Sequence, residues 1–107
     1  MAIVYPTTAD FDDLTKDGFW IADFYTSMCG PCKLLDVIIN DIVTENPDIN
    51  WAKCNLENDW GFQDKFDVQG TPTLIYFMDG EIKGRHVGGF CTRKEIEEEI
   101  SKCMYGD

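Results

Sequence analysis

Between residues 19 and 56, an apolar run, a Cys-Gly-Pro-Cys motif, a helical pattern and a second apolar run follow one another. The nearly continuous run Phe19–Tyr25 is typical of a central strand that is covered on both faces. After Cys32 the apolar residues recur with the period of a helix, which Asn46 and Pro47 end. Residues 49–56 are expected to form a second buried strand. Because a strand–helix–strand crossover of this kind joins parallel strands, the segment predicts a layered α/β fold.

Shorter elements are expected on both sides of this crossover, where glycine, proline or aspartate bounds the apolar patterns. Thr8 is expected to cap the first helix, and Asp79 with Gly80 to form a two-residue hairpin. Thr92 and Glu95 have the spacing of a capping box at the start of the last helix. The predicted order is β-α-β-α-β-α-β-β-α, in a single domain over residues 1–107. The added elements are strands at residues 3–5, 73–78 and 82–87, and helices at residues 9–16, within 59–66 and from residue 93.

The charge balance is strongly acidic, with 20 Asp and Glu against 9 Lys and Arg and a formal net charge of −11. Phosphate backbones and anionic membrane surfaces repel such a chain, so we expect no nucleic acid and no membrane as partner. Residues 1–5 carry no basic side chain, and no apolar run approaches the roughly 20 residues of a membrane helix. We therefore expect a soluble, cytoplasmic protein.

The chain has five cysteines, an odd number that argues against a framework of structural disulfides. Only Cys29 and Cys32 lie close together in sequence. One special pair of thiols is typical of a reducing compartment. We interpret Cys54 and Cys103 as packing residues, and Cys91 as a packing residue or a semi-exposed regulatory thiol.

The position of the Cys29–Cys32 pair at the start of a helix gives its two-residue spacing a chemical meaning. Backbone N–H groups and the helix dipole favour an anion there, so they stabilise a Cys29 thiolate. Pro31 lies in the first turn, where its missing N–H costs nothing. We expect an exposed Cys29 to attack a substrate disulfide and an inward-facing Cys32 to resolve the mixed disulfide, with no metal or organic cofactor.

Half of a zinc site is the alternative interpretation, because zinc sites also use two-residue cysteine spacings. No second such pair follows in the sequence, and His86 has no cysteine or histidine beside it. The proline within the motif and the helix start favour the redox interpretation.

Several segments resemble those of the thioredoxin family, and together they span essentially the whole chain. Residues 24–33 resemble the family's active-site sequence, including its Gly-Pro dipeptide. Residues 70–73, Gly-Thr-Pro-Thr, resemble the segment that carries the family's cis-proline. Asp23 and Lys53 match the family's buried acid and its lysine neighbour, and Gly88 matches the glycine beside the cysteine pair.

The resemblance implies a thioredoxin fold, with a central mixed sheet flanked by helices. It also implies a general reductase of disulfide-containing proteins that a thioredoxin reductase recharges. A cis peptide bond between Thr71 and Pro72 is implied, which exposes the Thr71 backbone to a substrate strand. The residues implied to contact substrate are Met28, Gly30, Pro31, Thr71, Pro72 and Gly88.

Two positions depart from the family pattern. Tryptophan most often precedes the first cysteine in the family, whereas this chain has Met28, a flexible side chain that offers partners a different surface. The family's long helix usually carries a kinking proline at the position of Val37, so we expect a straighter helix here. Neither change removes a reacting group.

Asp23 interrupts an apolar strand, and Lys53 lies on the neighbouring predicted strand. Because buried unpaired acids are rare, we favour a functional role for Asp23, as the base that activates Cys32. A partly exposed strand end or a hydrogen-bonded core carboxyl is the alternative. Lys53 is either a supporting residue of the site or a solvent-facing residue of its strand.

Three functions fit these features, and the sequence favours a disulfide reductase that uses Cys29 and Cys32. A specialised oxidase or isomerase on the same fold is the second hypothesis, which the Gly-Pro dipeptide disfavours. The third is a binding or assembly module that uses the surface of the fold, and the intact cysteine pair argues against it.

Overall fold

The structure, a computed structural model, describes residues 3–88 and 91–106. Within these ranges the elements follow the predicted order, and the strands form one sheet in the order β1-β3-β2-β4-β5. The strands are β1 (Ile3–Val4), β2 (Phe19–Tyr25), β3 (Asn50–Asn55), β4 (Thr73–Met78) and β5 (Glu81–Val87). The helices are α1 (Phe11–Thr15), α2 (Gly30–Glu45), α3 (Gly61–Phe66) and α4 (Arg93–Tyr105).

Strand β2 lies at the centre of this sheet, as its apolar run predicts. It pairs in parallel with β3 on one side and antiparallel with β4 on the other. The pairing with β3 sets Asp23 opposite Lys53, and the pairing with β4 sets Asp23 opposite Leu74. The sheet is therefore mixed, as the resemblance implies, and its one acidic central position adjoins a lysine.

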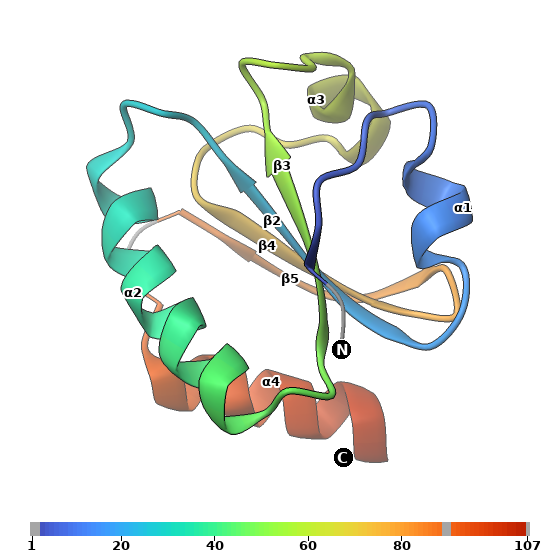
Figure 1. Cartoon of the computed structure of the whole chain (residues 1–107), viewed down its shortest axis with the longest axis vertical. Helices are drawn as coiled ribbons and strands as arrows, with labels where there is room; N and C mark the ends of the chain where they lie inside the picture. Colours follow the sequence, from blue (N-terminus) through green and yellow to red (C-terminus); the bar gives the residue numbers. More distant parts are fainter. Residues whose placement is uncertain (1–2, 89–90, 107) are drawn as a thin grey trace.

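Helices cover both faces of the sheet (Figure 1). On one face α2 and α4 pack a mainly aliphatic core against the sheet, and on the other α1 and α3 pack an aromatic one. Helix α2 runs unbroken over 16 residues and buries Leu35, Ile39 and Ile42. Because both faces are covered, β2 has no exposed face and its side chains from Phe19 to Phe24 are buried.

Local chemistry sets the ends of several elements. Asp79 and Gly80 have φ angles of 51° and 84°, so the predicted hairpin turn is confirmed. Thr92 and Glu95 form the predicted capping box. The cap predicted for Thr8 is wrong, because α1 begins after Asp10; the backbone N–H of Thr8 instead donates to Asp59 Oδ2 at 2.7 Å.

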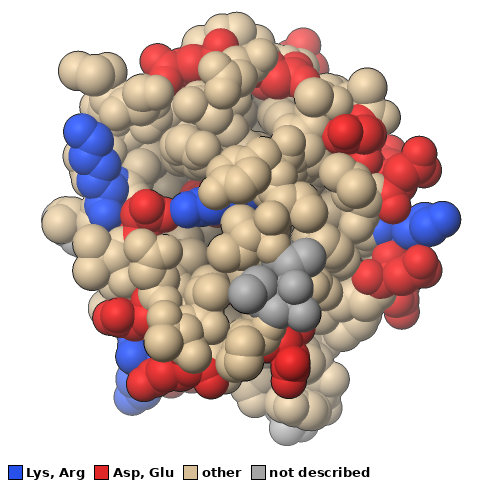
Figure 2. Space-filling view, viewed as in Figure 1, with Lys and Arg blue, Asp and Glu red and all other residues tan. Residues whose placement is uncertain are grey.

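The acidic surface expected from the net charge of −11 is visible on the face drawn in Figure 2. Acidic side chains gather in several groups around its edge, with a largely uncharged surface across the middle. No helix in the described part of the chain is both long and apolar enough to cross a membrane.

The aromatic core predicts a large penalty for truncating Phe11. Its ring lies 4.8 to 5.9 Å from those of Phe62, Phe66 and Phe77, measured between centroids, and is 1% exposed. Phe11→Ala should lower the free energy of unfolding by about 3–5 kcal/mol, because the cavity cannot collapse among packed rings. Leu14→Ala, on the exposed side of the same helix, is the matched control and should change it by about 0.5 kcal/mol or less. Equal losses in urea melts of the two variants would contradict this packing.

Candidate functional site

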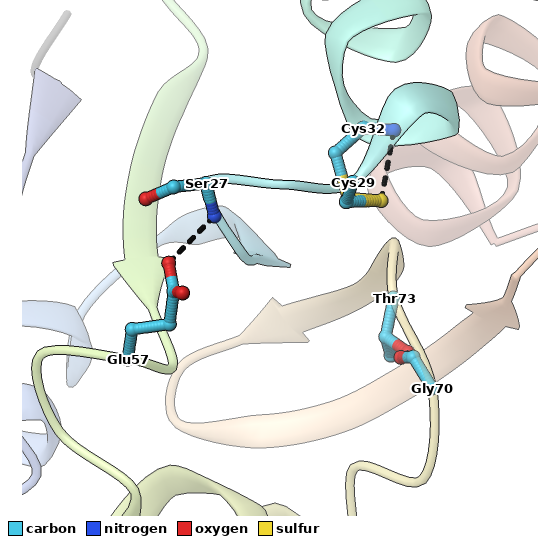
Figure 3. The surroundings of a disulfide bond; sticks show 6 residues. All are labelled: Ser27, Cys29, Cys32, Glu57, Gly70 and Thr73. Atoms are coloured by element: carbon cyan, nitrogen blue, oxygen red, sulfur yellow. Dashed lines mark hydrogen bonds between the residues drawn. A yellow bond between two sulfur atoms is a disulfide. The ribbon is translucent and has the colours of Figure 1, made fainter.

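The structure joins Cys29 and Cys32 by a disulfide bond at the start of α2, with their Cα atoms 5.2 Å apart. Cys29 is the N-cap of the helix, and its Sγ accepts a hydrogen bond from the backbone N–H of Cys32 at 3.1 Å (Figure 3). Pro31 lies in the first turn, as predicted. A sulfur of this pair therefore lies where the helix offers unpaired N–H groups, which stabilise a thiolate once the bond is reduced.

The predicted exposure of Cys29 is wrong for this disulfide form. Cys29 and Cys32 are both 9% exposed in the structure, where a disulfide bond joins them at the start of α2. The two sulfurs differ instead in their surroundings. Cys29 lies between the 87%-exposed Met28 and the exposed Gly30, whereas Cys32 lines a half-open cavity.

A second loop lies in the surroundings of the disulfide (Figure 3). The peptide bond between Thr71 and Pro72 is cis, as the resemblance implies. The backbone N–H of Gly88 donates to Pro72 O at 2.6 Å, so the end of β5 is joined to this loop. Figure 3 shows the segment from Gly70 to Thr73 in the surroundings of the disulfide, where the Thr73 hydroxyl donates to Gly70 O at 2.6 Å. The residues implied to contact substrate thus come from three separate parts of the chain.

A hydrogen bond that the sequence analysis missed fixes the loop before the disulfide. The backbone N–H of Ser27 donates to Glu57 Oε1 at 2.7 Å, and Glu57 follows β3 (Figure 3). Hydrogen bonds from Ser27 hold the pKa of the Glu57 carboxyl below its usual value. The loop between β2 and α2 is therefore tethered to the neighbouring strand end.

Asp23 is the buried acid that the sequence predicts. It is 4% exposed, and its Oδ1 is buried with no hydrogen-bond partner among the described residues. Burial raises its pKa from 3.8 to about 7, against the opposing charge of Lys53 and with a smaller contribution from Asp36. Asp23 and Cys32 line the same cavity of about 260 Å³. The structure thus brings a carboxyl that titrates near neutrality to the inner cysteine.

Lys53 is neither solvent-facing nor paired with Asp23. Its Nζ makes an ion pair and hydrogen bond with Asp36, and its side chain is 15% exposed. Burial by itself lowers the pKa of Lys53, but the hydrogen bond and charge of Asp36, together with Asp23, raise it above its usual value. Asp36 was missed by the sequence analysis. Its position one helical turn after Cys32 is the signal that could have found it.

The remaining cysteines are packing residues with suppressed acidity. Burial raises the pKa of Cys54 strongly and that of Cys91 to about 11, so neither is a ready thiolate. The semi-exposed position considered for Cys91 is wrong, because the residue is 7% exposed. Among the described residues, no three side chains of metal-binding type cluster closely enough to hold a metal ion.

Comparisons with known proteins agree on one family. The sequence model of the thioredoxin family matches residues 2–102. Thioredoxin from Staphylococcus saprophyticus is 34% identical over 103 residues, which cover 95% of this chain and 98% of that protein. Thioredoxin from Staphylococcus aureus is 32% identical over 105 residues, with the same coverage. A mutant thioredoxin from Halobacterium salinarum has a similar structure, with a TM-score of 0.83, 27% identity and coverage of 94% of this chain and 88% of that one.

The buried position of Asp23 predicts a pH-dependent gain in stability on its removal. The pKa is about 7 in the folded state and near 3.8 in the unfolded chain, so the unfolded chain loses this proton first as the pH rises. The stability that the folded state loses through Asp23 therefore grows as the pH rises between these two values, and the full loss is reached above pH 7. Asp23→Ala should raise the free energy of unfolding above pH 7 by about 1–3 kcal/mol, and by little below pH 4.

Urea melts of the wild type and Asp23→Ala at pH 4, 6 and 8 measure this gain. Asp41→Ala, an exposed acid on α2, controls for the change of net charge and should leave the pH dependence unaltered. A loss of stability at pH 8, or a gain that does not grow with pH, would show that Asp23 is an ordinary structural carboxylate.

Proposed function

Because the chain belongs to the thioredoxin family, we propose that it works as a thioredoxin of the Cys-Gly-Pro-Cys type, with Cys29 as the attacking and Cys32 as the resolving thiol. Its activity is that of a thiol–disulfide oxidoreductase that reduces protein disulfides. The observation that supports these roles is the asymmetry of the pair: Cys29 adjoins the exposed Met28, and Cys32 adjoins the cavity of Asp23.

In the first step the Cys29 thiolate attacks one sulfur of a substrate disulfide. The substrate S–S bond breaks, a mixed disulfide with Cys29 forms, and one substrate thiolate leaves and takes a proton from water. The first turn of α2 stabilises the attacking anion, because the Cys32 N–H donates to the Cys29 sulfur and the positive end of the helix dipole lies beside it.

In the second step Cys32 resolves the mixed disulfide. The Asp23 carboxylate takes the Cys32 proton, the Cys32 thiolate attacks Cys29 Sγ, and the second substrate thiolate leaves. The pair ends as the Cys29–Cys32 disulfide, and the substrate has gained two electrons. A pKa of about 7 suits Asp23 to this role, since a general base acts best when its pKa is near the working pH.

The surface around Cys29 is the proposed substrate site. Met28, Gly30 and Pro31 contribute one side of it, and the Pro72 loop with Gly88 contributes the other. Thr71 precedes the cis peptide bond and offers its backbone to an extended substrate segment. Main-chain pairing of this kind accepts many sequences, which fits a general reductase.

The proposal extends to partners and compartment. A thioredoxin reductase returns the Cys29–Cys32 disulfide to the dithiol, so the protein takes part in electron transport and cell redox homeostasis. No further cofactor is needed, because the cysteine pair itself carries both electrons. A cytoplasmic location is supported by Cys54, Cys91 and Cys103, which form no disulfide in the structure.

The order of attack predicts which cysteine variant traps a substrate. Cys32→Ser should accumulate a mixed disulfide through Cys29 when it is mixed with a disulfide-containing protein, because attack survives and resolution does not. Cys29→Ser should trap little or none. Non-reducing gels and mass mapping of the linked peptides identify the bond. Equal trapping by the two variants would refute the assigned roles.

Because Met28 is exposed beside Cys29, replacing it should change the reaction with protein partners but not the intrinsic reactivity of the Cys29 sulfur. Met28→Trp should change the rate of reduction of a given protein substrate several-fold, because a rigid ring replaces a flexible side chain beside Cys29. The alkylation rate of reduced Cys29 by iodoacetamide should stay nearly unchanged. Val37→Trp, at an exposed position on α2, is the control for adding a ring. A large change in the iodoacetamide rate of Met28→Trp would contradict this separation.

A further inference from the structure

The cavity beside Cys32 contains a second carboxylate, to which the proposed reaction gives no role. Asp36 lies on α2 one turn after Cys32 and lines the same cavity. Its carboxylate accepts a hydrogen bond from the Nζ of Lys53, which lies on β3, and the two side chains form an ion pair. The Asp36 side chain is 46% exposed and that of Lys53 is 15% exposed, so the ion pair reaches from the wall of the cavity to the surface. Figure 2 shows a hollow between α2 and β3 with a basic and an acidic side chain in its wall.

Lys53 is ion-paired with Asp36 and has no ion pair with the buried Asp23 among the described residues. Lys53 lies opposite Asp23 in the pairing of β2 and β3, close enough for its charge to lower the pKa of Asp23. In the described part of the chain, however, Lys53 makes its ion pair with Asp36, and Asp23 Oδ1 has no hydrogen-bond partner. The cation whose charge acts on Asp23 is therefore bound by a second carboxylate, which lies on α2.

We propose that Asp36 is a positioning residue of the reaction: its carboxylate holds the Lys53 ammonium at the wall of the cavity, so that Asp23 stays free to take the proton of Cys32. This inference rests on the base role proposed for Asp23. It concerns a residue outside the motif, and it assigns Lys53 a role that depends on Asp36.

Among the groups that line the cavity, two act on the pKa of Asp23 by their charge, Lys53 and Asp36. Helix α2 contributes Cys32, Lys33 and Asp36; β2 contributes Asp23 and Tyr25; β3 contributes Lys53; and the segment after β1 contributes Tyr5. Burial raises the pKa of Tyr25 above its usual value, so this tyrosine stays neutral at physiological pH. Lys53 and Asp36 are the charged groups whose fields act on Asp23, and they act in opposite directions.

Removing the Asp36 charge should therefore release the lysine toward Asp23. A freed ammonium beside a buried carboxylate favours the ionised form and lowers its pKa, typically by about 1–3 units for close pairs. The loss of the Asp36 charge acts in the same direction. Asp23 would then be ionised at a lower pH but would be a weaker base toward Cys32.

Carbon-13 NMR of the Asp23 carboxyl, followed through a pH titration of the full chain in its disulfide form, tests the proposal. Asp36→Asn should move the titration midpoint of Asp23 down by about 1 pH unit. Asp36→Glu keeps the charge and should leave the midpoint closer to wild type than to Asp36→Asn. Asp41→Asn removes an equal charge from an exposed position of the same helix and should leave it unmoved. A midpoint in Asp36→Asn that matches that of Asp41→Asn, or that moves upward, would overturn the proposal.

A second comparison tests whether Asp36 acts through Lys53. In a Lys53→Met background, Asp36→Asn should move the Asp23 midpoint by less than half of its shift in the wild-type background. A shift of half or more would show that Asp36 acts directly by its own charge, and the positioning role would be wrong.

The functional consequence has its own readout. The acid limb of the pH–rate profile for single-turnover reduction of a protein disulfide should move down with the Asp23 midpoint in Asp36→Asn. If the NMR midpoint moves and the rate profile does not, Asp23 is not the base of the reaction, but the Asp36–Lys53 ion pair does control the pKa of Asp23. If the midpoint itself does not move, the inference fails and the proposed function is untouched.

Discussion

The direct passage from the central strand β2 into the long helix α2 is the constraint on which the rest of the structure depends. Because β2 is paired on both sides and covered on both faces, its end is fixed, and a short tethered loop then places Cys29 at the helix start. That junction brings a sulfur pair to the N–H groups of a first turn and sets Cys32 above the cavity of Asp23. The Pro72 loop, which is hydrogen-bonded to Gly88, lies in the surroundings of the same junction (Figure 3).

Below this junction lies Asp23, whose burial lowers the stability of the fold but also raises the pKa of its carboxyl. A carboxyl in the central strand of an apolar sheet is costly to ionise, and the charge of Lys53, which is ion-paired with Asp36, offsets that cost only in part. The same desolvation brings its pKa to the range in which it can exchange a proton with a thiol. The base role proposed for Asp23 therefore has a cost in stability, because the burial that raises its pKa also penalises its ionised form.

The sequence predicted the helices, strands and the cysteine pair because each of these depends on residues that are close together in the chain. The apolar run of β2, the Asp79-Gly80 turn and the Thr92 capping box all have local causes, and each is found where it was expected. The cis bond before Pro72 followed only from family resemblance. The Asp36 ion pair could not be predicted from the sequence, because its partner Lys53 is brought to it by a separate strand, β3. The burial of Cys29 likewise depends on how the surrounding segments pack, which the local pattern does not show.

The reduction potential of the Cys29–Cys32 pair tests most directly the central claim that this chain is a disulfide reductase. It is measured by equilibrating the protein with dithiothreitol couples of known potential at pH 7, alkylating the free thiols and counting the modified cysteines by mass. We expect a potential near that of other thioredoxins, about −270 mV, which is low enough to reduce protein disulfides. A potential between about −180 and −120 mV, the range of disulfide isomerases and oxidases, would contradict it.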